Sequence, residues 1–519
     1  MSQANQQRRG GRKARVALRT SPLEQDLRPI KPGLSSGHYK ALSVEQQNKI
    51  HHSVLEVLET VGFVDALPST IEYMTKAGAF MSPEGRLCIP KSLIEDTIAD
   101  ANRDFLLYGQ THHHDMNPHE NRVYFGTAGA GVHMVDYKTR QYRESHLKDL
   151  YDMARLVDQL EHIHFFQRTL VPRDLPDPYE MDVNTCYVSV AGTTKHVGSS
   201  WVDPTHFDAS MEMLHYIAGG EKKWRERPFV SMSSCFVVPP LKFAQDACRC
   251  LESAVKAGMP VLLLAAGQAG ATSPSSLSGA VVQEVAEVLG GLVYVHTIQK
   301  GAPAIFGTWP FVSDLRTGAM SGGSGEQAVL SAACAQMGRF YNLATGVPAG
   351  MSDSKLPDMQ AGIEAGYNHA IVGHSGANLV YESAGMQASL LGCSFEKLVI
   401  DHDSICAVMR SIRGVETDTD SLSVDVIRNV CINGPGHFLG HDQTLERMQR
   451  DYVYPLIGDR TSPKEWAENK SSESAERAHD FAHNILQNYF PNHIDKKTDD
   501  YIRARLPIKI DRSDMQKSL

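Results

Sequence analysis

A strand–helix–strand unit in the middle of the chain decides the fold class. Residues 229–266 read FVSMSSCFVVPPLKFAQDACRCLESAVKAGMPVLLLAA. The apolar runs at 229–236 and 261–266 have the length of buried strands, and 241–257 carries apolar residues at helical spacing. Two strands joined by a helix predict a parallel pair with a right-handed crossover.

The same unit repeats along most of the chain. Apolar runs lie at 123–126, 163–170, 196–201, 229–236, 261–266, 304–309, 343–349 and 378–384. Helical patterns follow at 146–160, 207–218, 241–257, 277–289, 326–341, 359–372 and 395–412, whereas 179–190 is weak as a helix. These repeats predict an α/β protein built on a (βα)8 TIM barrel. A doubly wound sheet is the alternative, but the even spacing and the lack of a GxGxxG after the first run favour the barrel.

Segments outside the alternating pattern predict three further regions. The barrel is expected at 121–414, after an N-terminal helical extension at 39–120 in which Ser43 caps a helix over 44–61. Residues 415–519 are expected to be a helical C-terminal region that ends in an extended tail from Pro491. Residues 1–38 form a basic stretch that predicts a disordered tail; an arm for an acidic partner and a transit peptide are alternatives. Its basic residues include Arg8, Arg9, Arg12, Lys13, Arg15 and Arg19.

Bulk composition excludes several function classes. The 519 residues are 42% hydrophobic and carry a net charge of −9, which argues against a nucleic-acid-binding chain. No run of 18 apolar residues occurs, so we expect no membrane span. The nine cysteines are scattered and odd in number, which predicts free thiols in a reducing cytoplasm.

The expected barrel turns the strand ends into a set of candidate site residues, because chemistry in this fold lies on the loops after the strands. Aromatic faces beside one carboxylate suit a cation without N–H groups, namely a quaternary ammonium. We therefore expect Glu382 to orient the amine. Core packing is the alternative for each aromatic side chain. The aromatic candidates for substrate binding are Trp309, Phe311, Trp201, Tyr381 and Tyr124; Ser234 and Cys235 also lie at a strand end.

Polar strand-end residues complete the candidate site. Arg168 with Gln268 would hold the polar end of the substrate, with a structural salt bridge as the alternative for Arg168. Asp353 joins Glu382 as a candidate catalytic carboxylate, with loop capping as its alternative. Although the chain has 23 histidines, it has neither HExxH nor a zinc spacing, so no metal site is predicted. Neither a G-x-S-x-G elbow nor a Walker A loop is present.

Three separated motifs give the chain a family resemblance. They are Gly-Met-Ser-Asp-Ser-Lys-Leu-Pro-Asp-Met-Gln-Ala-Gly at 350–362, Asp-Leu-Arg-Thr-Gly-Ala at 314–319 and Gly-His-Phe-Leu-Gly-His-Asp-Gln-Thr-Leu at 436–445. In this order they resemble the trimethylamine:corrinoid methyltransferase family, over essentially residues 40–490. The resemblance implies a TIM barrel that passes a methyl group to the Co(I) of cobalamin, a corrinoid carried by a separate partner protein and not bound tightly by the barrel itself.

One departure from the family pattern bears on the substrate. The founding trimethylamine enzymes carry pyrrolysine near the loop after the seventh strand, where this chain has Gly350, Met351 and Ser352. A quaternary amine is already cationic and leaves as a neutral amine. The resemblance therefore implies a member without pyrrolysine that acts on a glycine betaine-like quaternary amine.

Several alternatives stay open at the level of sequence. The same barrel could use tetrahydrofolate or another non-corrinoid acceptor. A non-catalytic protein that binds or senses quaternary amines would share the aromatic residues, and an unrelated barrel lyase or decarboxylase would share only the fold. Because large barrels often associate, a homo-oligomer is also considered.

Overall fold

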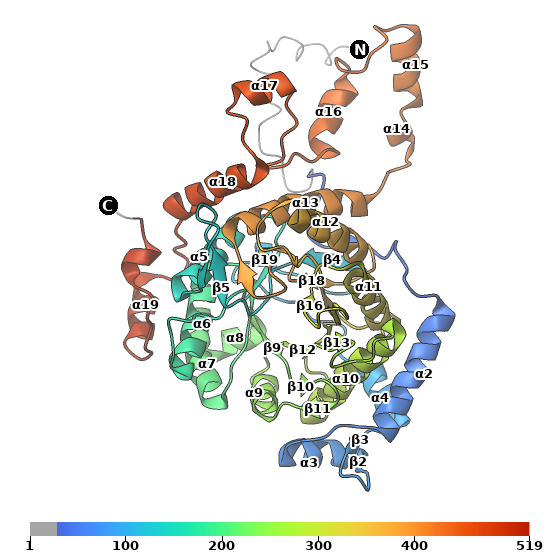
Figure 1. The fold of residues 1–519 in the computed structure, drawn as a ribbon, viewed down its shortest axis with the longest axis vertical. Helices are drawn as coiled ribbons and strands as arrows, with labels where there is room; N and C mark the ends of the chain where they lie inside the picture. The colour runs from blue at the N-terminus through green and yellow to red at the C-terminus, as the bar shows by residue number, and fades with distance from the viewer. Residues whose placement is uncertain (1–27, 518–519) are drawn as a thin grey trace.

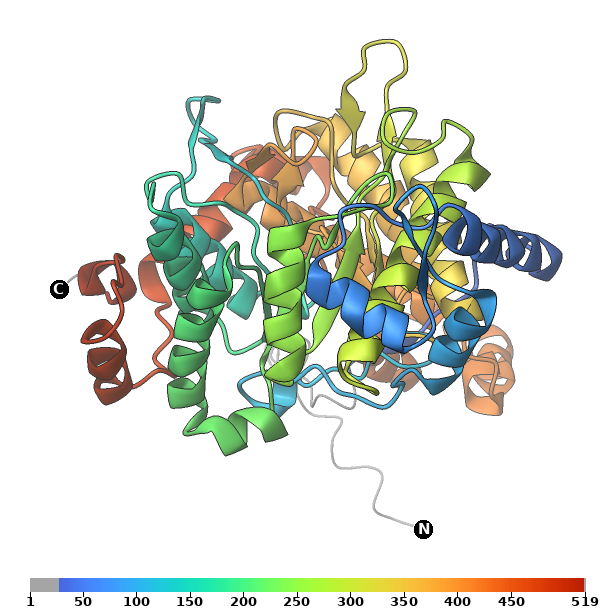
Figure 2. The ribbon, with the colours of Figure 1, turned by 90° about the horizontal axis from the view of Figure 1, so that it is seen from below.

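A closed barrel of parallel strands forms the centre of the molecule (Figures 1 and 2). The computed structural model describes residues 28–517. Parallel pairing runs from β7 through β8, β9, β12, β14, β17 and β18 to β4, and a parallel bridge between Gly126 and Phe165 joins β4 to β7. The (βα)8 prediction is therefore confirmed. The barrel strands are β4 (Arg122–Phe125), β7 (Phe165–Gln167), β8 (His196–Ser199), β9 (Val230–Ser234), β12 (Val261–Ala265), β14 (Ala304–Thr308), β17 (Thr345–Pro348) and β18 (Leu379–Tyr381).

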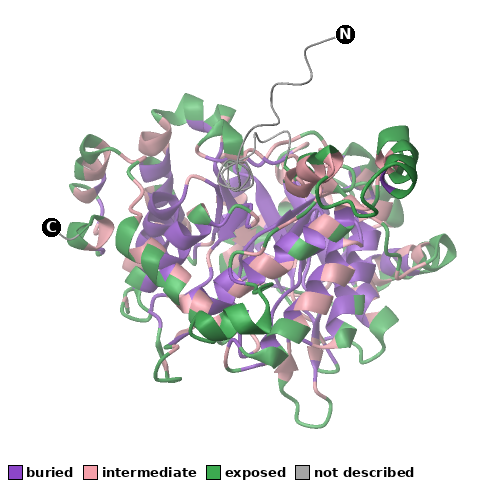
Figure 3. Ribbon diagram, turned by 90° about the horizontal axis from the view of Figure 1, so that it is seen from above, coloured by how far each residue is buried: buried purple, intermediate pink, exposed green. Residues whose placement is uncertain are grey.

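Helices surround the barrel, and buried residues concentrate in the strands and on the inner helix faces (Figure 3). These helices are α5 (Leu147–Gln159), α6 (Pro178–Gly192), α7 (Pro204–Ala218), α9 (Gln245–Lys256), α10 (Leu277–Ile298), α11 (Gly325–Phe340), α12 (Met359–Gly373) and α13 (Phe395–Arg413). The segment that is weak as a helix in the sequence is the regular helix α6. Every residue from Asp182 to Gly192 is buried, so α6 has no polar stripe from which a helical period could be recognised. Asp177 caps it by accepting from the N–H of Glu180.

Helix α10 is the most apolar of these helices. Within residues 28–517 it is the one helix long and apolar enough to cross a membrane by length and composition, and 78% of that window is buried inside the protein. It packs between β14 and the N-terminal helix α2 (Val44–Thr60), and it carries the buried residues Glu284 and Glu287.

The N-terminal extension wraps one side of the barrel. Strand β1 (Leu34–Ser35) pairs antiparallel with β4, so part of the predicted 1–38 tail is sheet, while residues 1–27 lie outside the described residues. Ser43 caps α2 in a capping box with Gln46, as expected. The extension continues through α3 (Pro68–Lys76), β2 (Phe80–Met81), β3 (Leu87–Cys88), α4 (Lys91–Asp100) and η2 (His112–His114).

The C-terminal region leaves the barrel and returns to it. An excursion at the top of Figure 1 contains α14 (Thr419–Leu422), α15 (Val424–Ile432), α16 (Asp442–Arg450) and α17 (Pro463–Glu468), after which α18 (Ser474–Asn488) packs on α13 and α5. The extended tail expected from Pro491 is wrong in part, because α19 (Lys496–Arg503) and η3 (Arg512–Met515) follow. The Asp495 side chain caps α19, and the Tyr187 hydroxyl donates to Asp499 within it.

Small sheets cover the ends of several barrel strands. One joins β13 (Gln268–Ala269), β15 (Phe311–Ser313) and β16 (Met320–Ser321); another joins β19 (Met386–Gln387), β20 (Gly392–Cys393), β5 (His133–Val135) and β6 (Tyr142–Glu144). The chain also has β10 (Val237–Val238), β11 (Lys242–Phe243) and α8 (Glu221–Glu226). The first two sheets lie on the loops after the strands, where the sequence places the site.

Candidate active site at the barrel mouth

A cavity of about 320 Å³ lies at the C-terminal ends of the barrel strands. Loops after β7, β8, β14 and β18 bring five residues of the predicted site to its wall: Arg168, Trp201, Trp309, Phe311 and Glu382. These residues are up to 214 positions apart in sequence and meet because parallel strands end at the same face of the barrel.

Neighbouring side chains hold the two tryptophan rings of the cavity wall, Trp201 and Trp309, in place. The Trp201 indole N–H donates to Ser210 Oγ on α7 at 2.9 Å, and its ring meets Phe207 edge-on at 5.1 Å between centroids. The Trp309 ring lies 4.9 Å from the ring of Tyr381. Both indoles line the cavity, and these contacts fix their orientation.

A buried carboxyl group fixes the backbone of Trp309. Glu284 on α10 accepts from the backbone N–H of Trp309 at 3.2 Å, and its other oxygen accepts from the N–H of Gly267. It therefore ties the loop after β12 to the loop after β14. Burial raises the pKa of Glu284 well above its usual value, and the neighbouring Glu287 raises it further.

Glu382 directly follows β18 and faces the cavity. Its backbone is left-handed, with φ of +55°, a conformation that most side chains avoid. Its Oε2 has no hydrogen-bond partner among residues 28–517. Burial raises the pKa of Glu382 to about 8, and a hydrogen bond with the Trp309 side chain acts in the opposite direction. A cation bound in the cavity would supply the partner that the Glu382 carboxylate lacks among these residues.

Arg168 is the corresponding unpaired cation. Within the described chain its guanidinium makes neither an ion pair nor a side-chain hydrogen bond, although its backbone N–H donates to Gly198 O at 3.1 Å. Burial lowers its pKa, which Cys235 and Asp182 partly oppose. The cavity therefore holds an unpaired cation and a carboxyl group with a free oxygen, an arrangement that suits a zwitterionic ligand.

Three of the predicted substrate-binding residues lie outside the cavity wall. Tyr381 packs beneath Trp309 and meets Phe165 edge-on at 4.8 Å; burial raises its pKa. The Tyr124 hydroxyl accepts from the N–H of Asn117 at 3.1 Å, away from the cavity. Gln268 lies in β13 and donates to Ser313 Oγ at 2.8 Å.

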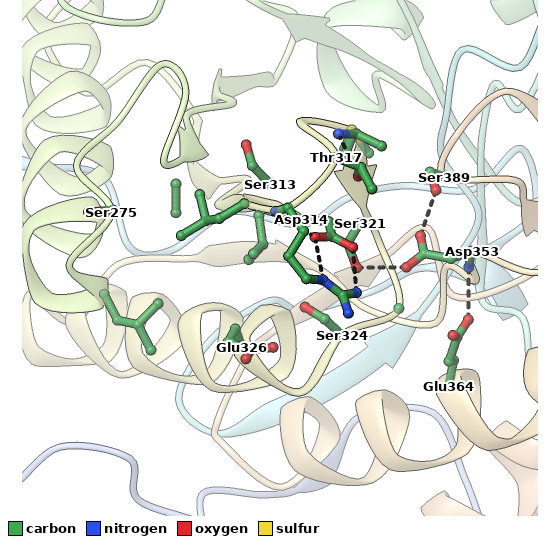
Figure 4. A pocket seen from close by; sticks show the side chains of 18 of the residues that line it. Ser275, Ser313, Asp314, Thr317, Ser321, Ser324, Glu326, Asp353, Glu364 and Ser389 are labelled. Atoms are coloured by element: carbon green, nitrogen blue, oxygen red, sulfur yellow. Dashed lines mark hydrogen bonds and ion pairs between the residues drawn. The ribbon is translucent and has the colours of Figure 1, made fainter.

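Asp353 lies in a separate hollow of about 720 Å³ beside the cavity (Figure 4). Its Oδ2 accepts from Ser321 Oγ at 2.6 Å, and its Oδ1 accepts from the N–H of Gly322 at 2.7 Å and from Ser389 Oγ at 2.6 Å. Both oxygens are thus occupied by neighbouring loops.

Cys235 and Leu390 are among the cavity residues to which the sequence assigned no role. Cys235 is accessible from the cavity, and the surrounding protein raises the pKa of its thiol while Arg168 lowers it. Cys235 lies at a strand end, as the sequence indicates. Leu390 also lines the cavity, but it belongs to an excursion after β18 that no sequence pattern marked. Among residues 28–517, no cluster of three or more His, Cys, Asp or Glu side chains could hold a metal ion.

Comparison with known proteins decides the family. The model of the trimethylamine methyltransferase (MTTB) family matches residues 8–509. The chain belongs to this family. It is 30% identical to "Trimethylamine methyltransferase MttB" of Desulfitobacterium hafniense (strain DSM 10664 / DCB-2) over 456 residues, which cover 88% of this chain and 91% of the relative.

Other MTTB relatives differ in the substrate that their names state. The "Glycine betaine methyltransferase" of Desulfitobacterium hafniense (strain Y51) is 29% identical over 90% of this chain and 96% of its own length. Among solved structures, the Methanosarcina barkeri monomethylamine methyltransferase (MtmB) aligns with a TM-score of 0.47 and 12% identity, covering 88% of this chain and 95% of that one. This MTTB chain is therefore a methyltransferase, and its family includes enzymes named for a tertiary and for a quaternary amine.

Proposed function

We propose that this chain transfers a methyl group from a small, glycine betaine-like quaternary amine to the Co(I) of a corrinoid carried by a separate protein in the cytoplasm. The observation that carries the proposal is the composition of the cavity. Aromatic faces of Trp201, Trp309 and Phe311 lie with Glu382 Oε2, which has no partner among residues 28–517, and with the unpaired guanidinium of Arg168. The relative named for glycine betaine supports the same substrate class.

The roles of Glu382 and the aromatic residues follow from the change in charge during the reaction. A quaternary ammonium loses its positive charge as the methyl group leaves, so a strong negative charge beside it would stabilise the substrate more than the transition state. Aromatic faces attract the cation more weakly, each by ~0.5–2 kcal/mol. With a pKa of about 8, Glu382 is only partly ionised near neutral pH, which limits this opposing effect while it orients the amine.

Arg168 would bind the carboxylate at the other end of the substrate, because a partly buried guanidinium without a partner among the described residues favours a bidentate anion. Gln268 could assist only by releasing Ser313. Tyr381 would act through its packing beneath Trp309, and Tyr124 through the packing of β4. The donor is then held with its methyl groups among the aromatic rings.

The corrinoid would supply a strong nucleophile from the partner protein, and this chain would supply the positioned methyl donor. Water exclusion by the buried aromatic wall would strengthen the contacts of the ammonium with Glu382 and with the rings.

A turnover assay tests the proposal. The purified protein is mixed with reduced cobalamin and a panel of methylated amines, and formation of the methylated corrinoid is followed by absorbance. Methylation with a betaine, but not with trimethylamine, supports the proposal. Demethylated product with tetrahydrofolate alone would support the non-corrinoid alternative, and binding by calorimetry without product would support a sensor.

A further inference from the structure

The turn at residues 388–390, which contributes Leu390 to the cavity wall, has an unusual backbone. Ala388, Ser389 and Leu390 have φ of 51°, 51° and 75°, three consecutive left-handed residues other than glycine. The turn connects β19 to β20, and Leu390 lines the cavity. Because a Cβ disfavours the left-handed backbone, such a turn persists only where neighbouring groups hold it.

Hydrogen bonds to the loop after β17 hold this turn. Ser389 Oγ donates to Asp353 Oδ1 at 2.6 Å, as Figure 4 shows. The backbone N–H groups of Ala388 and Ser389 donate to Ser354 O at 2.9 Å and to Ser352 O at 3.1 Å. The Ser389 hydroxyl provides the side-chain part of this attachment, and its acceptor is a carboxylate, which makes the bond stronger than one between neutral groups.

Asp353, the acceptor of the Ser389 hydrogen bond, is itself held in place by a residue on α12. Glu364 on α12 accepts from the backbone N–H of Asp353 at 2.8 Å and from Ser352 Oγ at 2.6 Å. Asp353 also accepts from Ser321, which belongs to β16, and from the N–H of Gly322 directly after it. The loop after β17 is therefore a fixed base, and the 388–390 turn is attached to it.

We infer that Ser389 and Asp353 are positioning residues, which hold Leu390 against the cavity and thereby keep the bound amine shielded from water. This inference rests on the proposed function for the identity of the ligand. Asp353 lines the neighbouring hollow, and three donors occupy its oxygens, so it acts on the amine through Ser389 and Leu390 rather than by contact. Loss of the Ser389 bond would let water reach the ammonium and weaken its attraction to the aromatic faces.

Hydrogen exchange tests the attachment without any substrate. The full chain with Ser389→Ala is compared with the wild type, and Ser69→Ala is the matched control, because Ser69 Oγ also donates to a carboxylate, Glu252, at 2.6 Å. We expect the amides of Ala388 and Ser389 to exchange on the order of tenfold faster in Ser389→Ala alone. Equal exchange in all three proteins would overturn the inference.

Kinetics with glycine betaine separate positioning from contact. We expect Ser389→Ala to raise KM about tenfold and to change kcat by less than about threefold. Asp353→Asn should lose only a few-fold in kcat/KM, because its amide oxygen can accept from Gly322 and Ser389 while its NH₂ donates to Ser321 Oγ. Asp353→Ala, checked for folding by circular dichroism, should lose far more.

The contrary outcomes are distinct. If Asp353→Asn loses as much kcat/KM as Asp353→Ala while its Ala388 and Ser389 amides exchange as in the wild type, the negative charge acts on the amine other than through the turn and the positioning role is refuted. If the wild type neither binds nor demethylates any quaternary amine, the proposed function fails, whereas the exchange experiment still decides whether Ser389 and Asp353 hold the turn.

Discussion

Replacing Glu382 with glutamine should abolish a pH dependence of ligand binding. Because burial raises the pKa of Glu382 from 4.5 to about 8, about a tenth of the side chains are ionised at pH 7 and nearly all at pH 9. If the carboxylate is the form that binds a quaternary ammonium, the apparent Kd should fall about tenfold between pH 7 and pH 9 and stay constant above that range.

Glu382→Gln should lose both the charged contact with the ammonium and the pH dependence of the Kd. A buried charge pair contributes about 3 kcal/mol, so Glu382→Gln should bind on the order of 100-fold more weakly at pH 9 and about tenfold more weakly at pH 7. Binding can be followed by tryptophan fluorescence, because Trp201 and Trp309 line the cavity. Cys235→Ser is the control for titration of the neighbouring thiol, and it should retain the slope.

The pH dependence of the free energy of unfolding gives an independent check on Glu382. The folded chain holds the Glu382 proton more tightly than the unfolded chain, so ionisation of Glu382 lowers the free energy of unfolding as the pH rises from about 4.5 to about 8 and has no further effect above. The Tm of Glu382→Gln relative to the wild type should therefore increase between pH 5 and pH 8. A wild-type Kd that is flat from pH 6 to pH 9, or the same slope in both proteins, would refute the assigned role.

Three further substitutions test the rest of the cavity. Trp309→Ala should weaken binding of tetramethylammonium about tenfold, whereas Trp466→Ala, on the distant helix α17, should not, as measured by calorimetry. Arg168→Met should weaken the binding of glycine betaine on the order of 100-fold but change the binding of tetramethylammonium by less than about threefold, because only glycine betaine has a carboxylate. Equal losses for the two ligands would exclude the carboxylate contact. Glu284→Gln should lower kcat/KM about tenfold, because its single amide oxygen can accept from only one of the two backbone N–H groups. Glu287→Gln, on the same helix, is the control.

The sequence predicted the barrel because its strands are short, evenly spaced apolar runs, and the strands of the structure overlap these runs. Helix α6 was harder to predict, since residues buried on every side leave no alternation of polar and apolar positions. The helices after Pro491 were missed because their stability depends on partners such as Tyr187 and the Asp495 cap, which a local pattern does not reveal.

The expectation that chemistry lies on the loops after the strands led to five residues that line one cavity, but it did not give the direction of each side chain. Tyr381 and Glu382 are neighbours, so they cannot both face the cavity from an extended strand, and the left-handed backbone at Glu382 decides between them. Asp353 and Ser389 are 36 positions apart in sequence, and their contact depends on the turn at 388–390, which has neither the glycine nor the asparagine that usually marks a left-handed turn.

The position of the cavity also constrains the order in which two reactants can bind. It lies at the loop end of the barrel, with Leu390 in its wall, and under the proposed function the protein-borne acceptor would approach the same end. If so, the small amine would have to enter before the acceptor docks, and its demethylated product would have to leave after the acceptor departs. Steady-state rates should accordingly follow a compulsory-order ternary-complex scheme, with intersecting double-reciprocal lines and inhibition by excess acceptor that rising amine relieves.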